Sequence, residues 1–232
     1  MSDAFHQVYD REDIAYGLTP SAELAAYLHA VHPTGTAIDL GAGAGRDTLA
    51  LAAAGLQVTS VDLSPRGLER IVQRATERGI QQHVTTVHAD VREFDFPVGT
   101  VQVLCATTVL DHIPSNDADA VWPRFVQSLD PTNGVMYVEV HSTEDPASDQ
   151  PPGCDSSAPR SETAEHVVNY FAPGRLVRMA LDAGLRVLRY EERIEWDKTH
   201  GPEHQHGKQI LLACVPGFCP EWFGHPKAFP KP

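Results

Sequence analysis

The chain has 232 residues, which is enough for one domain whose core needs no disulfide or metal to hold it together. Hydrophobic residues make up 42% and charged residues 21%, the composition of a globular protein that is neither disordered nor embedded in a membrane. The formal net charge of −13, without any cluster of lysines and arginines, argues against nucleic acid as a partner. We therefore expect a small-molecule substrate, or alternatively a protein, with no membrane and no nucleic acid involved.

The N-terminal sequence MSDAFHQVYDRED has neither the basic segment nor the apolar segment of a secretory signal. The four cysteines are scattered, which is typical of reduced thiols rather than of a disulfide framework; they are Cys105, Cys154, Cys214 and Cys219. These features predict a cytoplasmic protein, and the sequence is compatible with a monomer or a homodimer.

Helix-like and strand-like segments alternate in chain order. The first predicted helix, over 18–31, has Thr19 as its N-cap and Pro20 at its first position. The later helices are expected over 46–55, 65–79, 117–129 and 173–184, and the strands over 36–40, 57–63, 84–90, 101–110, 134–142, 186–196 and 208–215. This alternation predicts a Rossmann-like, doubly wound α/β fold with a seven-stranded sheet, mostly parallel with an antiparallel last strand.

Several residues set the expected ends and faces of these helices. Gly55 closes the second helix as a C-terminal glycine, and Ser64 with Pro65 starts the third. Pro123 should bend the fourth helix. The third helix should bury one apolar face, made of Leu68, Ile71, Val72 and Ala75.

Three segments surround this framework within a single domain that we place at residues 1–215. Residues 1–35 form an N-terminal flap and helix. Residues 143–168 are rich in proline, serine and acidic residues and follow a central strand, so we predict an active-site lid there, with a disordered insertion as the alternative. Residues 216–232 form a proline-rich C-terminal tail that Trp222 and Phe223 could anchor.

A glycine-rich turn follows the first strand in the sequence AIDLGAGAGRDTLALAAAG, residues 37–55. Such a turn lets the backbone approach a ligand closely. A dinucleotide-binding turn reads G-x-G-x-x-G, but the third glycine position here is Arg46. A nicotinamide cofactor is therefore disfavoured, although an arginine at this place could meet an anion.

The turn, together with three later motifs, resembles the class I S-adenosylmethionine-dependent methyltransferases. The resemblance implies that Asp62, 21 residues after Gly41, holds the ribose hydroxyls, and that Asp90 and the Val91 amide hold the adenine. The resemblance also implies that Thr107, at the end of the fourth strand, lies where the methionine moiety passes. The cofactor-binding set that follows is Asp39, Gly41, Ala42, Gly43, Arg46, Asp62, Leu63, Asp90, Val91 and Thr107, with S-adenosyl-L-methionine as cofactor and S-adenosyl-L-homocysteine as product.

Each of these carboxylates, taken alone, has a simpler interpretation. Asp39 and Asp90 could be turn residues, and Asp62, which precedes Leu63, Ser64 and Pro65, could belong to a helix cap. It is their joint occurrence at these spacings that favours the cofactor site.

Within this class the sequence is most similar to the tellurite-resistance (TehB-like) group of small methyltransferases. The similarity rests on GRDTLALAAAGLQVTSVDLSP, ATTVLDHIP and YFAPGRLVRMALDAGLRVLRYEE, and it is weaker across 143–168. It implies a small acceptor such as a chalcogen oxyanion or a thiol.

Histidines after the later strands are the candidate acceptor residues. His112 is the predicted catalytic base, and His141 follows the fifth strand as a predicted substrate contact. In the expected loop THGPEHQHGK, His200 is a catalytic candidate and His204 a substrate contact. A solvated hairpin is the alternative there; His200, His204 and His206 could also supply metal ligands, but no metal is assigned.

Two tyrosines precede the first helix. Tyr16 is a predicted substrate contact, and Tyr9 could lie against the sulfonium or anchor the flap. The sequence thus predicts a methyltransferase acting on a chalcogen oxyanion or thiol. The alternatives are a metabolite O- or N-methyltransferase with His112 as base and, more distantly, a regulator that binds S-adenosylmethionine without transferring its methyl group.

Overall fold

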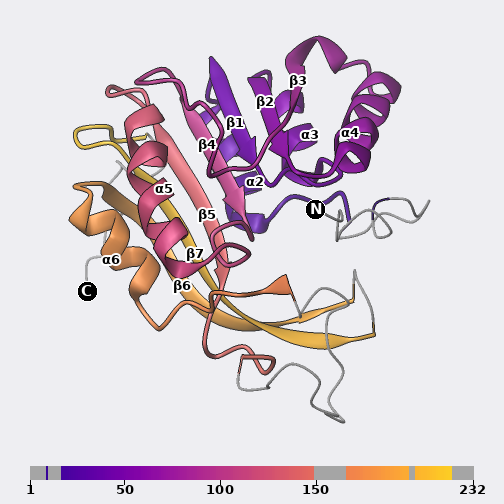
Figure 1. Cartoon of the computed structure of the whole chain (residues 1–232). Helices are drawn as coiled ribbons and strands as arrows, with labels where there is room; N and C mark the ends of the chain where they lie inside the picture. Colours follow the sequence, from indigo (N-terminus) through magenta and orange to yellow (C-terminus); the bar gives the residue numbers. More distant parts are fainter. Residues whose placement is uncertain (1–8, 10–16, 149–165, 199–201, 221–232) are drawn as a thin grey trace, which may run out of the picture.

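The computed structural model describes residues 9, 17–148, 166–198 and 202–220 of the chain. Its centre is a seven-stranded sheet in the order β3-β2-β1-β4-β5-β7-β6 (Figure 1). The strands are β1 (Thr36–Leu40), β2 (Gln57–Asp62), β3 (Val84–His88), β4 (Val103–Thr107), β5 (Val135–His141), β6 (Arg186–Asp197) and β7 (His204–Cys214). β7 is antiparallel to its neighbours β5 and β6, and the pairs among the first five strands are parallel. The predicted fold class is confirmed.

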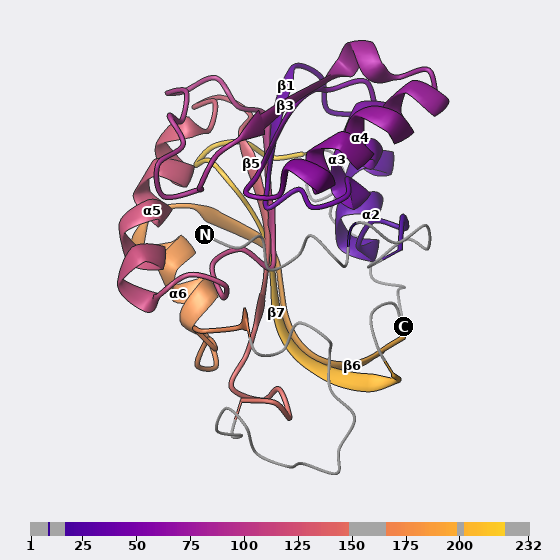
Figure 2. The same cartoon turned by 45° about the vertical axis from the view of Figure 1, so that its right-hand side comes forward.

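In the described part of the chain, five α-helices from α2 onward cover the two faces of this sheet. They are α2 (Ala22–Val31), α3 (Arg46–Ala53), α4 (Pro65–Glu77), α5 (Ser115–Ser128) and α6 (Arg175–Asp182), and a short 3-10 turn, η1 (Gln81–His83), precedes β3. Seen along the sheet, α5 and α6 lie on one side and α2, α3 and α4 on the other (Figure 2). The sheet is therefore wound on both faces, as the alternation of elements predicts.

The core divides between the two faces because successive side chains of a strand point in opposite directions. In β4, Leu104 and Ala106 pack with α5 and α6, whereas Val103 and Cys105 pack with α2 and α3. All seven residues of β5 are buried, as expected for a strand covered on both faces.

Some element ends differ from those expected. The first helix starts at Ala22 with Ser21 as its N-cap, so the prediction of Thr19 and Pro20 at its start is wrong by two residues. Ser64 caps α4 by accepting a hydrogen bond from the Gly67 amide, as predicted. Val72, expected to be buried on α4, is 49% exposed, while Leu68, Ile71 and Ala75 on the same helix are buried. The apolar face of α4 is thus narrower than the sequence pattern indicates.

The largest difference lies in the last hairpin. β7 begins at His204, not at 208, because its backbone pairs with β6 as far as the Asp197–His204 register. Residues 204–207, expected in a loop, are therefore part of the sheet. Pro123 lies inside α5, which continues to Ser128, and the expected bend there stays a prediction. Among the residues that the structure describes, none forms a helix of the length and apolarity that a membrane crossing requires.

Candidate active site

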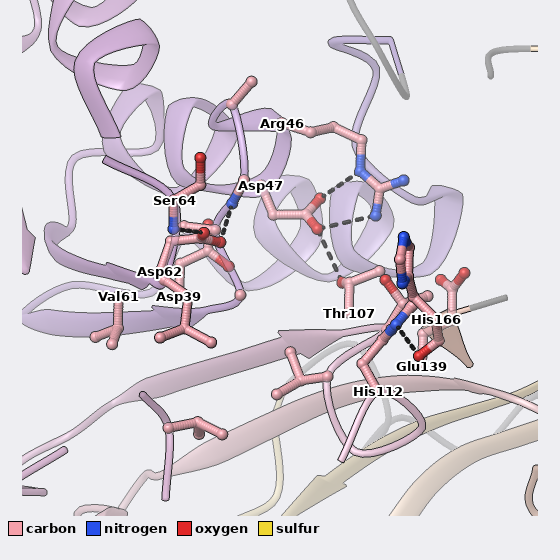
Figure 3. A pocket seen from close by; sticks show the side chains of 18 of the residues that line it. Asp39, Arg46, Asp47, Val61, Asp62, Ser64, Thr107, His112, Glu139 and His166 are labelled. Carbon is pink, nitrogen blue, oxygen red and sulfur yellow. Dashed lines mark hydrogen bonds and ion pairs between the residues drawn. The ribbon is translucent and has the colours of Figure 1, made fainter. Parts of the chain in front are cut away.

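A pocket of about 1050 Å³ opens at the carboxyl ends of β1, β2, β3, β4 and β5 (Figure 3). This is the edge of a doubly wound sheet at which ligands bind. All ten residues of the predicted cofactor-binding set line it, and so do His112 and His141. The structure thus brings together residues from five separate strand ends that the sequence analysis had connected only through a resemblance.

The glycine turn between β1 and α3 forms one wall of the pocket. Gly41, Gly43 and Gly45 have φ angles of 61°, 52° and 94°, in the left-handed region that favours glycine. A side chain on Gly41 would lie 2.6 Å from Val109 Cγ2, and one on Gly43 would lie 2.7 Å from the Tyr9 hydroxyl. The turn therefore needs glycine for its backbone conformation as well as for space.

Asp62 ends β2 beside this turn. One carboxylate oxygen accepts a hydrogen bond from the Gly43 amide, and the other accepts one from the Ser64 amide, both at 2.7 Å. The carboxylate therefore ties the glycine turn to the start of α4, and it lines the pocket in a half-buried position (Figure 3). A carboxylate oxygen has two lone pairs, so Asp62 can still accept from a ligand hydroxyl.

Asp90, after β3, lies in the pocket wall but is paired. Its two oxygens accept hydrogen bonds from the Arg92 guanidinium at 2.9 and 2.6 Å. These hydrogen bonds lower the pKa of Asp90, although partial burial opposes the shift. Arg92 also bonds Asp117 at the start of α5. A ligand amine at Asp90 would have to share its carboxylate with Arg92, a constraint that the sequence does not show.

Behind the turn, two buried carboxyl groups lie close together. Asp39 accepts a hydrogen bond from the Thr48 hydroxyl at 2.5 Å, and its burial and the charge of Asp47 raise its pKa to about 8. Asp47 bonds Arg46 at 3.0 Å and Thr107 at 2.9 Å, which links the start of α3 to the end of β4. The sequence analysis did not identify Asp47. Its place next to Arg46 in the chain does not indicate that its side chain lies under the pocket.

A second charged group lies where β5, β6 and β7 meet. Lys208 of β7 bonds Glu139 of β5 at 2.7 Å and Glu195 of β6 at 2.6 Å. Burial opposes ionisation of Glu139, but the Lys208 charge outweighs it and lowers the Glu139 pKa to about 2. All three residues line the pocket. The sequence does hold one indication of this group, because Glu139 interrupts the otherwise apolar strand VMYVEV. The sequence analysis overlooked it.

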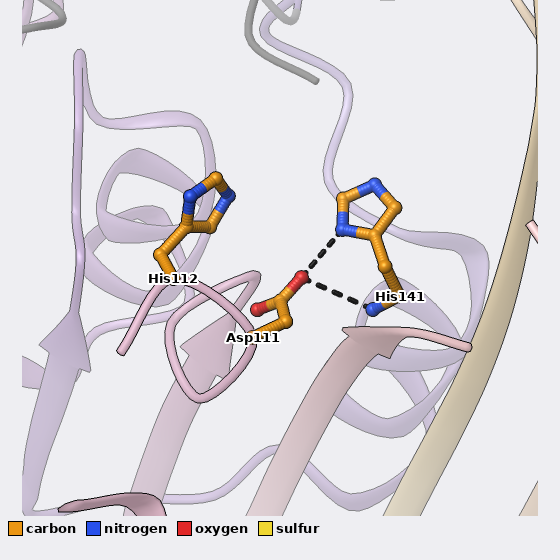
Figure 4. A group of neighbouring side chains, drawn as sticks. All are labelled: Asp111, His112 and His141. Atoms are coloured by element: carbon orange, nitrogen blue, oxygen red, sulfur yellow. Dashed lines mark hydrogen bonds and ion pairs between the residues drawn. The ribbon is translucent and has the colours of Figure 1, made fainter. Parts of the chain in front are cut away.

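His112 and His141 stand on either side of Asp111, a fully buried residue that follows β4 (Figure 4). Asp111 Oδ2 accepts hydrogen bonds from His141 Nδ1 at 2.5 Å and from the His141 amide at 3.0 Å. Burial lowers the His141 pKa, but the hydrogen bond and charge of Asp111 outweigh this and raise it. Asp111 Oδ1 is buried and has no hydrogen-bond partner among the residues described.

The surroundings of His112 lower its pKa, whereas those of His141 raise the pKa of that residue. His112 Nδ1 donates to the His166 carbonyl at 3.0 Å, and burial lowers its pKa although the Asp111 charge opposes the shift. His112 is therefore neutral near pH 7, with its proton on Nδ1 and the lone pair on Nε2. His166 and Val168, at the end of the predicted lid, line the same pocket. The middle of the lid lies outside the described residues, so the lid itself stays a prediction.

The remaining histidines differ most from the sequence expectation. His204 and His206 are only 2% and 5% exposed, so the solvated-hairpin interpretation is wrong for both. They project from β7 on the side of the sheet that carries Lys208. Lys208 itself is engaged by two glutamates. His200, Tyr16, Cys154, Trp222 and Phe223 lie outside the described residues; Tyr9 is buried against Gly43.

Comparisons with known proteins agree with this geometry. Residues 37–132 match the family model of a methyltransferase domain. A mitochondrial small-subunit ribosomal RNA methyltransferase of Arabidopsis thaliana is 33% identical over 67 residues, which are 29% of this chain and 18% of that protein. The chain thus spans less than a fifth of the length of the curated relatives it matches.

Similar solved structures cover much more of the chain. TehB from Haemophilus influenzae has a TM-score of 0.66 and 16% identity over 91% of this chain and 65% of that one. A Burkholderia thailandensis 1,6-didemethyltoxoflavin-N1-methyltransferase with bound S-adenosylhomocysteine has a TM-score of 0.61 and 20% identity, over 91% and 84%.

The glycine turn, the strand order and the family match together define the class: this is a protein with the class I methyltransferase fold. More particularly, residues 37–132 match the model of a methyltransferase domain, and the overall fold is similar to that of TehB. The resemblance inferred from the sequence is confirmed.

Proposed function

We propose that the protein is an S-adenosylmethionine-dependent methyltransferase acting on a small-molecule acceptor. The observation that carries the proposal is the position of Asp62, whose half-buried carboxylate ends β2 beside a glycine turn in a pocket of about 1050 Å³. The turn offers backbone without side chains, and Asp62 offers acceptors for two neighbouring hydroxyls. When bound, S-adenosylmethionine would supply an electrophilic methyl group on a sulfonium.

The charged groups of the pocket favour one orientation for this cofactor. Asp62 and Asp90 lie at the β2 and β3 side, where a nucleoside fits, whereas Asp47, Thr107 and Glu139 lie at the β4 and β5 side. Carboxylates at that side suit the ammonium of a methionine moiety, and they also favour a sulfonium. The reacting methyl group would then face the histidines that follow β4 and β5.

At that end of the pocket, His112 is the group suited to take a proton from an acceptor. It is neutral, and Nδ1 is already a donor, so Nε2 accepts the proton. When bound, S-adenosylmethionine would supply its methyl group to the acceptor that His112 has deprotonated, and S-adenosylhomocysteine would leave as the product. Asp111, next to His112 and with one oxygen unpartnered, stabilises the imidazolium that results.

This arrangement favours an oxygen or nitrogen acceptor that must lose a proton. A thiol or chalcogen oxyanion, the acceptor class of the TehB resemblance, is the second candidate, because a thiolate or selenite is nucleophilic near neutral pH without a base. Lys208 is already engaged by Glu139 and Glu195, and Glu195 also bonds Arg193, which weighs against a dianionic acceptor at this place.

Transfer of labelled methyl from S-adenosylmethionine to a panel of phenols, amines, carboxylates, thiols, selenite and tellurite, read by mass spectrometry, tests the proposal. Label on an oxygen or nitrogen acceptor supports the role of His112, and label on a thiol or chalcogen supports the second candidate. Tight cofactor binding without transfer to any acceptor would instead indicate a non-catalytic regulator. Absence of cofactor binding by calorimetry would refute the proposal as a whole.

A further inference from the structure

A group of buried polar side chains lies at the acceptor end of the pocket, where β5 ends and β7 begins. Within it, His141 is 8% exposed, His206 is 5% exposed and Asp145 is 3% exposed. The rings of His141 and His206 have their centroids 4.7 Å apart. One ring nitrogen of each histidine and one carboxylate oxygen of Asp145 all lie within 4.8 Å of one another. Three potential metal ligands from separate parts of the chain therefore come together away from bulk water.

The 142–148 segment, which follows β5, brings Asp145 into this group. The Gly207 amide donates to Asp145 Oδ2 at 3.1 Å, and the Ala147 amide donates to Asp145 Oδ1 at 2.8 Å. A side chain on Gly207 would lie 2.4 Å from the Asp145 amide nitrogen, so the close approach of the segment to β7 requires glycine. Backbone contacts thus fix the Asp145 carboxylate in a position that faces His206.

The spacing between His206 and Asp145 suits two ligands of one ion. His206 Nδ1 lies 3.1 Å from Asp145 Oδ2. Adjacent ligand atoms at about 2.1 Å from a metal stand about 3.0 Å apart in an octahedral site and about 3.4 Å apart in a tetrahedral one. In the structure the two atoms share a hydrogen bond, and a bound ion would take the place of its proton.

His141 has the kind of outer partner that metal-bound histidines characteristically have. The fully buried Asp111 accepts hydrogen bonds from His141 Nδ1 at 2.5 Å and from the His141 amide at 3.0 Å (Figure 4). A carboxylate on one ring nitrogen of a histidine fixes the orientation of the ring and leaves the other nitrogen to hold a metal. For His141, the nitrogen that remains for an ion is Nε2.

The charges around the group also favour a cation. Asp111 and Asp145 are buried beside the two imidazoles, and buried carboxylates require a balancing positive charge. Lys208 of β7 already bonds Glu139 and Glu195. A divalent cation would balance Asp111 and Asp145 while both imidazoles stay neutral, which is the form that binds a metal. Protonation of the imidazoles is the alternative, and a metal titration separates the two.

We propose that His141, His206 and Asp145 bind a divalent transition-metal ion of the zinc type. Two imidazoles and one carboxylate suit Zn²⁺, Co²⁺ and Fe²⁺ and leave at least one coordination position open. His204 packs against His206 with ring centroids 4.5 Å apart, but among the described residues it is not part of the group of three. His141 and His206 line the pocket, so the ion would border the space where the acceptor lies. The site goes beyond the proposed function and does not depend on it.

The test measures metal binding and needs no methyl acceptor. Full-length protein without a purification tag, stripped with a chelator and dialysed, is titrated with Co²⁺ while its visible absorption is recorded. Zn²⁺ is titrated in competition with a chromophoric chelator. We expect one equivalent of either ion to bind. His206→Gln and Asp145→Asn should each weaken binding by at least about 100-fold, the upper end of what the loss of an outer partner alone costs.

Two matched controls separate the ligands from their neighbours. His204→Gln removes an equally buried imidazole from the same strand and should weaken binding by no more than about 10-fold. His29→Gln/His32→Gln removes two exposed histidines from the end of α2 and should bind the metal as the wild type does.

Circular dichroism and thermal unfolding establish whether each variant is folded. If His206→Gln and Asp145→Asn both fail to fold, electron paramagnetic resonance of the Cu²⁺-loaded wild type decides, because the proposal requires hyperfine couplings from two imidazoles. Three results would each overturn the proposal: failure of the wild type to bind one equivalent at micromolar metal, equal weakening by His204→Gln and His206→Gln, or a Cu²⁺ spectrum without those couplings. The imidazoles would then balance the buried carboxylates by protonation.

Discussion

Replacement of Asp62 by alanine tests the cofactor site most directly. In the structure its carboxylate already accepts the Gly43 and Ser64 amides at 2.7 Å, so its orientation is fixed before any ligand arrives. A hydrogen bond to a charged acceptor contributes about 1.5–3 kcal/mol. Asp62 is half-buried and partly solvated, which places each of the two expected ribose contacts at the lower end of that range. Loss of both, about 3 kcal/mol, corresponds to a rise of about 150-fold in the dissociation constant.

Isothermal titration calorimetry with S-adenosylmethionine and with S-adenosylhomocysteine measures this change, because neither experiment requires an acceptor. Asp62→Asn is the matched variant: it keeps the shape and one acceptor oxygen, and we expect it to lose about half of the binding free energy that Asp62→Ala loses. Urea unfolding of each variant separates a loss of affinity from a loss of the glycine turn itself. A folded Asp62→Ala protein that binds the cofactor within twofold of the wild type would show that Asp62 serves only as the tie between the turn and α4.

Three further predictions concern the acceptor end, the buried carboxyl group and the last hairpin. His112→Gln should lower kcat by about 10²–10⁴-fold for an oxygen or nitrogen acceptor and leave cofactor affinity unchanged; unaltered turnover in a steady-state assay would exclude it as the base. Burial and the charge of Asp47 raise the pKa of Asp39 to about 8, so the folded protein keeps this group protonated at pH values where the unfolded chain has lost the proton. The stability contributed by the neutral form is therefore complete below pH 4 and is lost as the pH rises through about 8. The free energy of unfolding should therefore fall between pH 5 and pH 9 in the wild type and fall less in Asp39→Asn, and parallel curves from urea titrations would contradict this. Gly207→Ala should cost about 1–3 kcal/mol, because its side chain meets the Asp145 backbone, and a variant with the wild-type urea midpoint would show that the 142–148 segment moves freely.

Much of this protein can be derived from its sequence because the relevant signals are local. The order of strands and helices follows from apolar periodicity, and the ends of α3 and α4 follow from Gly55 and from Ser64 with Pro65. The glycine turn is equally local, since Gly41, Gly43 and Gly45 supply the left-handed backbone that the turn requires. These features predicted the fold class and the cofactor end of the pocket. The approach of Asp62 to Gly43 follows as soon as β1 and β2 pair in parallel.

The acceptor end was decided by tertiary structure. Asp145 and His206 are 61 residues apart in the chain, and Asp111 and His141 are 30 apart. No periodicity or spacing records such pairs, because they form only when the sheet brings the ends of β4, β5 and β7 together. Residues 204–207 belong to β7 because they pair with β6. This pairing places His204 and His206 in the sheet, where they are buried, and not in the expected loop. The sequence determined which chemical groups are present, and the packing determined which of their nitrogens carry protons and which face one another.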